Sequence, residues 1–262
     1  MMRHYWADYK SYEFNDVDPD KTIAIMPTAA IEQHGPHLPV GVDTFINQGM
    51  LDTLIPKLTS KHDVRILPVQ AVGKSNEHLY APGTLTIPAD LAIRLWTEIG
   101  LSVARAGVRK MIIVNSHGGN VDVNSIVSRE LRVQAGMFCV KTQWTSFGHP
   151  DGMFSDREMS YGLHGGDVET SLMLHFHPNL VDMSKAIDFS STAETNSISP
   201  IGPTSYGWIA SDLNEHGVVG DASSATAEKG KAVANFQTDG MVQLLDRVAA
   251  QDWRLRDATI KK

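Results

Sequence analysis

The stretch Met111-Ile112-Ile113-Val114-Asn115-Ser116-His117-Gly118-Gly119-Asn120 places a short apolar run directly before a polar, glycine-rich segment. Four apolar residues followed by turn-forming residues are typical of a strand that is buried on both faces. Asn120 is a plausible N-cap for a helix that ends at Gly136. Three apolar side chains share one face of that helix: Val123, Val127 and Leu131. The stretch therefore predicts a strand, a loop and a helix in succession.

The same alternation extends along the chain on both sides of this stretch. Apolar runs predict further strands at residues 22–27, 64–69 and 137–142. Helical spacing of apolar residues predicts helices over residues 45–58, 88–106, 120–136, 167–177 and 226–250, although Gly230 and Gly240 weaken the last. We expect an α/β fold, with a mainly parallel sheet covered by helices and right-handed crossovers. Residues 190–214, rich in Ser, Thr, Pro and Gly, predict a long functional loop.

Composition limits the functional classes. A chain of 262 residues with 42% hydrophobic content can bury one sizeable core, so we expect a single domain over residues 1–262. The formal net charge is -7 and no basic run offsets it, so neither nucleic acid nor an anionic membrane is an expected partner. A small-molecule substrate is favoured instead. The sequence shows no secretory signal and no membrane-spanning run, so we expect the cytoplasm. Cys139 is expected to be a buried free thiol.

Chemistry-bearing residues follow the predicted strands in three clusters. Glu32 and His34 come after the first strand and point to the same side of an extended chain, and Asp43 opens the next helix. His117 follows the strand at residues 111–114, where parallel sheets present ligand-binding loops. His164 and Glu169 form the third cluster, at the start of a predicted helix: the segment is His164-Gly165-Gly166-Asp167-Val168-Glu169.

Each of these residues alone has an ordinary structural interpretation, as a hydrogen-bonded histidine or a solvated carboxylate. Three glycine-flanked clusters at separate loops are less easily explained as coincidence. Two histidines and three carboxylates suit zinc, manganese or iron(II), and the absence of clustered thiolates argues against a structural zinc site. Two metal ions sharing a carboxylate would favour hydrolysis of an unactivated amide. Phosphate-binding, dinucleotide-binding, HExxH and GxSxG motifs are absent.

The remaining histidines and aromatic residues are expected to serve structure more often than chemistry. We expect the following to be mostly structural or surface histidines: His37, His78, His149, His175 and His177. The following are expected to be packing residues: Trp144, Tyr161, Tyr206 and Trp208. Trp208, in the long loop, is also a candidate wall of a substrate pocket.

Taken together, the motifs resemble the creatininase (creatinine amidohydrolase) family. The resemblance covers most of the chain and rests on residues 32–43, 115–120, 164–171, 216–221 and 225–230. It implies a three-layer α/β/α domain, often in a homohexamer, with a two-metal centre that hydrolyses cyclic amides or related C–N bonds. By motif position it implies four metal ligands, of which Asp43 would bridge the ions: Glu32, His34, Asp43 and His117.

Three positions depart from the pattern of creatinine-hydrolysing members. Gly119 stands where those members carry a glutamate ligand, and Glu169 is the nearest candidate to complete the set. Leu163 replaces a glutamate, and Gly118 replaces an aromatic pocket residue. Creatinine is therefore not the expected substrate. Branches that remove formyl groups from pyrimidine precursors or cut modified peptides have a His-Gly-Gly-Asn pattern closer to this one.

We therefore expect an amidohydrolase with two divalent ions (zinc, manganese or iron), in which a bridging hydroxide held over Asp43 attacks a carbonyl. His164 would orient the substrate or deliver a proton to the leaving nitrogen. Candidate substrate contacts are Gly118, Asn120, His164 and Trp208. A deformylase, a peptide-processing hydrolase, a non-catalytic metabolite-binding relative and a structural single-metal protein are the alternatives.

Overall fold

A four-stranded parallel sheet forms the centre of the molecule. The computed structural model describes residues 3–254. The strands are β1 (Ile23–Thr28), β2 (Val64–Ile66), β3 (Lys110–Asn115) and β4 (Phe138–Gln143), in the spatial order β2-β1-β3-β4. Every neighbouring pair is parallel. The expected parallel α/β architecture is confirmed.

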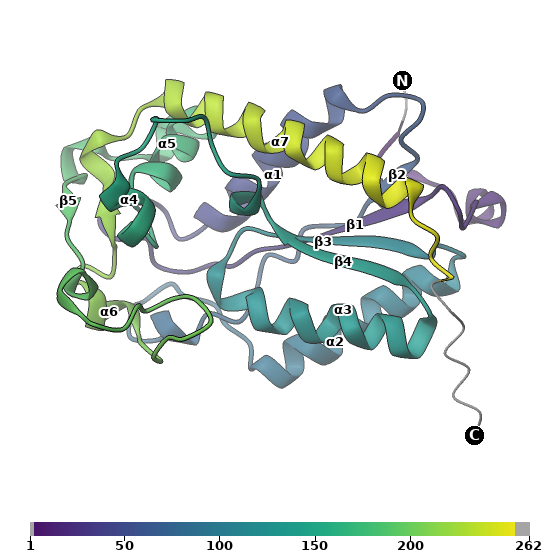
Figure 1. Cartoon of the computed structure of the whole chain (residues 1–262), viewed down its shortest axis with the longest axis horizontal. Coiled ribbons are helices and arrows are strands. Elements are labelled where there is room, and N and C mark those ends of the chain that lie inside the picture. Colours follow the sequence, from purple (N-terminus) through teal and green to yellow (C-terminus); the bar gives the residue numbers. More distant parts are fainter. Residues whose placement is uncertain (1–2, 255–262) are drawn as a thin grey trace.

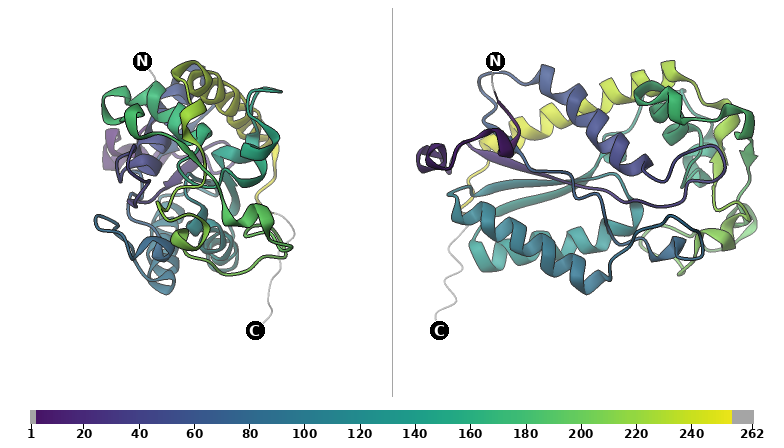
Figure 2. Two further views of the ribbon diagram at one scale, coloured as in Figure 1. Left: turned by 90° about the vertical axis from the view of Figure 1, so that its left-hand side faces the viewer. Right: turned by 180° about the vertical axis from the view of Figure 1, so that it is seen from behind.

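Helices cover both faces of this sheet in a three-layer arrangement (Figures 1 and 2). One layer contains α1 (Val42–Leu54), α5 (Asp167–Phe176) and α7 (Ala227–Ala250), and the other contains α2 (Ala89–Arg105) and α3 (Val121–Ala135). Side chains alternate along β1, so Ile23 and Ile25 belong to the first core and Ala24 and Met26 to the second. Because both faces are covered, all six residues of β1 are buried.

Shorter elements gather beyond the carboxyl ends of the strands (Figure 1). They include α4 (Asp156–Tyr161), α6 (Ala210–Leu213) and an antiparallel pair, β5 (Asp188–Phe189) with β6 (Gly220–Asp221). Turns of 3₁₀ helix occur at Trp6–Asp8, Ser11–Asp16, Ile55–Lys57, Asn76–His78, Gly118–Asn120, Trp144–Phe147, Pro178–Leu180, Met183–Lys185, Thr192–Thr195 and Ala222–Ser224. The long loop predicted at residues 190–214 therefore contains a 3₁₀ turn and α6.

Several predicted boundaries move for identifiable reasons. The second strand ends at Ile66 and does not reach residue 69, since Pro68 has no N–H to donate to a sheet. The helix predicted at 45–58 begins at Val42 and changes to 3₁₀ geometry at Ile55, where Pro56 follows. Cys139 is only half-buried, and burial raises the pKa of its thiol to about 12. It lies on β4, an edge strand of the described sheet.

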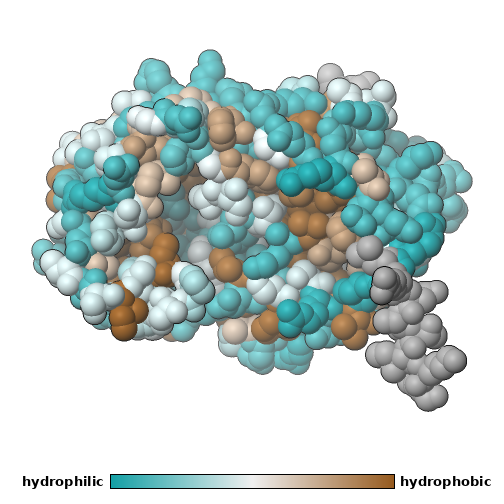
Figure 3. All heavy atoms as spheres, viewed as in Figure 1, coloured by the Kyte–Doolittle hydropathy of each residue, from teal (hydrophilic) through white to brown (hydrophobic). Residues whose placement is uncertain are grey.

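Helix α2 is confirmed, but only the second half of its apolar series at every fourth residue faces the core. Leu91 and Leu95 are 41% and 43% exposed, whereas Val103, the last of the series, is buried. Residues spaced by four drift around a helix of 3.6 residues per turn, so the series begins on the exposed side and ends on the packed side. Within the described residues, no helix has the length and apolar character needed to cross a bilayer. Figure 3 shows small apolar groups among hydrophilic side chains on one face.

Gly230 marks the closest approach between α7 and α5. A Cβ at this position would overlap the Ser171 carbonyl group. Gly240, further along α7, would place a Cβ 2.7 Å from Cδ1 and 2.9 Å from Cβ of Phe147. Both glycines in the predicted helix are therefore close-contact positions: Gly230 against the backbone of Ser171, and Gly240 against the base of the Phe147 side chain.

We expect Gly230→Ala to lower the free energy of unfolding by about 1–3 kcal/mol, because α7 must shift away from α5. Gly207→Ala is the control, since a Cβ on Gly207 would meet no atom within 4 Å. Urea denaturation of both variants measures the difference. Equal stability of the two variants would contradict the packing described for Gly230.

Candidate metal centre

The predicted clusters meet above the carboxyl ends of β1 and β3. Glu32 and His34 lie on the loop after β1, Asp43 lies in the first turn of α1, and His117 follows β3. All four side chains are buried. The ends of adjacent parallel strands open on the same edge of a sheet, which is why segments distant in sequence converge here.

These side chains form two groups that share Asp43. In the first, His117 Nδ1 lies 3.1 Å from Glu32 Oε1 and 3.5 Å from Asp43 Oδ2. In the second, His34 Nε2 lies 3.7 Å from Asp43 Oδ1 and 3.7 Å from Glu169 Oε2. The ligand atoms of each group lie within 4.8 Å of one another. Asp43 thus offers a different oxygen to each group, as a carboxylate that bridges two cations would.

Two buried polar atoms in this centre have no hydrogen-bond partner. They are His34 Nε2 and Asp43 Oδ2, and such atoms are costly to bury. The remote nitrogens are engaged: His34 Nδ1 lies 3.0 Å from the Glu32 carbonyl oxygen, and His117 Nε2 lies 2.9 Å from that of Lys74. In the neutral imidazoles that bind metal ions, N–H donation to these carbonyls leaves His34 Nε2 and His117 Nδ1 with lone pairs facing the carboxylates. The donor set therefore fits divalent cations.

The pKa shifts of these residues show that several carboxylates are crowded together. Burial disfavours ionisation of Glu32, but the charge of the His117 imidazolium and its hydrogen bond hold the pKa of that carboxyl well below its usual range. Burial and the charge of Glu32 raise the pKa of Asp43 to about 7. Burial opposes the imidazolium of His34, yet Asp43 raises the pKa of His34 to about 9. Burial also raises the pKa of Glu169.

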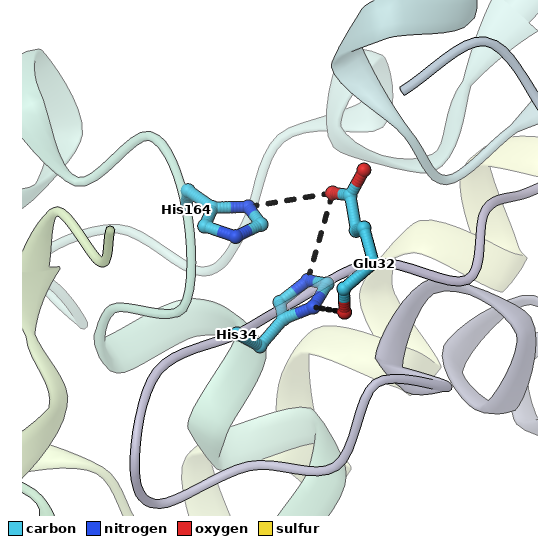
Figure 4. A group of neighbouring side chains, drawn as sticks. All are labelled: Glu32, His34 and His164. Atoms are coloured by element: carbon cyan, nitrogen blue, oxygen red, sulfur yellow. Dashed lines mark hydrogen bonds and ion pairs between the residues drawn. The ribbon is translucent and has the colours of Figure 1, made fainter. Parts of the chain in front are cut away.

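His164 lies beside the first two residues of the centre (Figure 4). Its Nδ1 is 3.6 Å from Glu32 Oε1, and its ring centroid is 4.1 Å from that of His34. Its Nε2 lies 2.7 Å from the Gln33 carbonyl oxygen, so that nitrogen carries the proton. The Nδ1 lone pair consequently faces the interior of the centre.

His78 is a site residue that the sequence did not reveal. Sequence analysis placed it among structural or surface histidines, but its Nε2 lies 3.6 Å from Glu32 Oε1. The amide of Gln33 donates to His78 Nδ1 over 2.8 Å, which fixes the proton on Nε2. Its position in the polar segment after β2, the strand beside β1, was the available signal.

Glu77 and Gly119 explain one departure from the creatininase pattern. Glu77 Oε1 lies 3.5 Å from His117 Nε2, on the side of the ring away from Asp43. The Glu77 carboxylate and the Lys74 carbonyl occupy the space that a Cβ on residue 119 would need. Glycine is therefore required at position 119, and the carboxylate that lies within reach of His34 on α5 is Glu169, at 3.7 Å.

The residues expected to contact substrate differ in their burial and in their hydrogen bonds. A Cβ on Gly118 would meet no atom within 4 Å, so this position faces open space. Asn120 is fully buried and its side chain bonds to Ala29, Lys74 and Asn115, which ties loops together instead of facing a substrate. Trp208 is half-buried against Leu213 and Val219 and donates Nε1–H to the Pro200 carbonyl.

The other histidines set aside by sequence analysis stay outside the metal-binding groups found in the described part of the chain. His37 is buried, and its Nε2 lies 3.1 Å from the Gly165 carbonyl oxygen and 3.0 Å from Thr170 Oγ1. It supports the loop that carries His164. Three more take no part in those groups: His149, His175 and His177.

Comparison with known proteins agrees with this geometry. The family model for creatinine amidohydrolase matches residues 7–245. The mycofactocin precursor peptide peptidase of Mycolicibacterium smegmatis is 28% identical over 86% of this chain and 85% of its own length. Creatinine amidohydrolase of Pseudomonas putida is 25% identical over 90% and 93%. A solved structure described as "Creatininase Mn" superposes with a TM-score of 0.74 at 21% identity, covering 94% and 99%.

The structural match confirms the three-layer fold, and the family model spans all of the residues that make up the centre. The chain therefore belongs to the creatininase (creatinine amidohydrolase) family of hydrolases.

Proposed function

We propose that this protein is a metal-dependent amidohydrolase that cleaves a C–N bond of a small molecule. The observation that carries the proposal is the pair of groups sharing Asp43, in which every residue but the half-buried Glu169 is buried, with unpartnered atoms on Asp43 and His34. Glu32, Asp43 and His117 would hold one divalent cation, and His34, Asp43 and Glu169 the other. Bound zinc, manganese or iron would supply Lewis acidity and acidify water.

The chain's own residues then account for orientation and proton movement. His164 presents its Nδ1 lone pair to the centre and would take a proton from the attacking water, then return it to the leaving nitrogen. His78 presents Nε2–H beside Glu32 and would orient that carboxylate or the substrate. A non-catalytic metabolite-binding protein would not need two cation-binding groups complete in their ligand types, and a structural single-metal protein would need only one.

A peptide substrate is the second candidate, and Gly118 favours it. Gly118 is exposed and a Cβ there would meet no atom within 4 Å, so a substrate extending past this residue would meet no side chain at that point. One relative is named as a peptidase of a precursor peptide. Cyclic amides, formamides and short peptides are therefore the substrate classes to compare.

Metal content tests the assignment of ligands. We expect two bound divalent ions per wild-type chain, loss of both in Asp43→Asn, and loss of one in Glu169→Gln, because only Asp43 serves both groups. Elemental analysis of protein reconstituted with Mn²⁺ or Zn²⁺ gives the stoichiometry. Hydrolysis of amide substrates should disappear in Asp43→Asn.

Asp52→Asn is the matched control for this experiment, since Asp52 also lies on α1 but hydrogen-bonds to Tyr5 and Gln48. It should keep both ions. Full metal content or unchanged turnover in Asp43→Asn would rule out the proposed centre.

Substrate size tests the role of Gly118. Its backbone does not require glycine, so Gly118→Trp should fold normally and fill the open space. For a peptide substrate we expect kcat/KM to fall by at least about tenfold, the loss expected for a displaced binding group, while formamides and small cyclic amides are spared. Equal losses for all substrates would count against this position as a determinant of size.

We also propose that the chain assembles as a homo-oligomer, a hexamer by family resemblance. Exposed apolar side chains on α2 and α3 support an association surface: Leu91, Leu95, Ile126 and Val133. Light scattering coupled to size exclusion should give the mass of an oligomer, and Leu95→Glu should reduce it. A monomeric wild-type protein at micromolar concentration would refute this assembly.

A further inference from the structure

We propose that Glu158 is a positioning residue for the metal centre, because its buried carboxylate fastens the segment carrying His164 and the start of α5, which carries Glu169. The proposal rests on the proposed function as far as metal binding is concerned. Sequence analysis gave Glu158 no role, and α4, on which it lies, was not predicted.

The carboxylate of Glu158 binds backbone amides of two separate segments. Oε1 accepts the N–H of Asp167 over 2.7 Å, at the first residue of α5. Oε2 accepts the N–H of Asp221 over 2.8 Å, on β6. Glu158 is 5% exposed. One side chain therefore joins α4 to the start of α5 and to β6.

Three glycines crowd around this carboxylate. A Cβ at Gly162, Gly166 or Gly220 would come within 2.8 Å of an oxygen of Glu158. Two of them flank the segment that carries His164, and the third precedes Asp221. The backbone can approach the carboxylate on all sides only because these positions lack side chains.

No ion pair neutralises Glu158 among the described residues. The neighbouring Arg157 turns away from it and binds Asp188 and Glu194. Burial raises the pKa of Glu158, and the amide N–H groups counter this effect. The start of α5 adds the positive end of a helix dipole. A carboxylate that has no cationic partner and accepts hydrogen bonds from backbone amides holds those backbone segments in position.

The fastened segments lead directly to the centre. Val219, two residues before Asp221, exchanges backbone hydrogen bonds with His164: His164 N–H donates over 3.3 Å and Val219 N–H over 2.8 Å. Gly165 N–H donates to Glu169 Oε2 over 2.6 Å. Glu158 thus holds both sides of the segment from which His164 and Glu169 enter the centre.

The test combines hydrogen exchange with metal titration on the full chain. Glu158→Gln keeps the size of the side chain but turns an amide NH2 group toward one backbone N–H. That hydrogen bond is lost, because both groups are donors. Segments 162–169 and 219–221 should lose protection from exchange, and affinity for Mn²⁺ should fall by about tenfold to a hundredfold, as for other residues that orient metal ligands. Gly162→Ala keeps the Glu158 side chain but would place a Cβ against its carboxylate and its backbone carbonyl, and should give the same two effects.

Arg157→Gln is the matched control, because it removes the exposed ion pairs of α4 and leaves the Glu158 carboxylate untouched. It should keep the protection of both segments and the Mn²⁺ affinity. Unchanged protection in Glu158→Gln, or lost protection with wild-type Mn²⁺ affinity, would overturn the positioning role. A wild-type protein that binds no Mn²⁺ would instead overturn the proposed function, and the exchange of segments 162–169 and 219–221 would still decide whether Glu158 holds them.

Discussion

The carboxylate of Asp43 is the constraint on which the rest of the structure depends. It lies between His34 and His117, where burial and the charge of Glu32 raise its pKa to about 7. Burying several carboxylates together is unfavourable unless positive charge or hydrogen-bond donors surround them. The fold meets this demand by bringing histidines from four segments to one point. The centre therefore costs stability that the two apolar cores on either side of the sheet must supply.

Backbone carbonyls and amides, more than side-chain ion pairs, hold the centre in shape. The carbonyls of Glu32, Lys74 and Gln33 each receive the remote nitrogen of a histidine and orient its other nitrogen inward. Ser75 donates its hydroxyl to Glu32 over 2.5 Å, and Gly165 donates its amide to Glu169. Short backbone connections of this kind leave little rotational freedom, so the side-chain nitrogen and oxygen atoms of the centre stay close together.

The sequence predicted the parts of this arrangement that depend on strand order. Apolar runs identified the strands, and their carboxyl ends explain why Glu32, Asp43 and His117 meet. The place of His78 in the centre was missed because it depends on β2 lying beside β1, and no local sequence pattern predicts that strand order. The buried role of Asn120 was also hidden, since an amide in a glycine-rich loop is equally suited to substrate or backbone. Glu158 was hidden because its partners are backbone amides more than eight residues away.

The two glycines after His117 show how the residue at one position limits the choice of residue at another. Glu77 and the Lys74 carbonyl fill the space beside Gly119, so a carboxylate cannot enter the centre from that position. In the proposed centre Glu169, on α5, completes the second group of ligands, and it lies 3.7 Å from His34. A ligand on α5 makes that centre depend on how α5 is anchored, whereas a ligand on the loop after β3 would be held by the sheet itself. Gly118 leaves open space on the same loop, so the proposal has substrate enter on the β3 side and the ligand come from the α5 side.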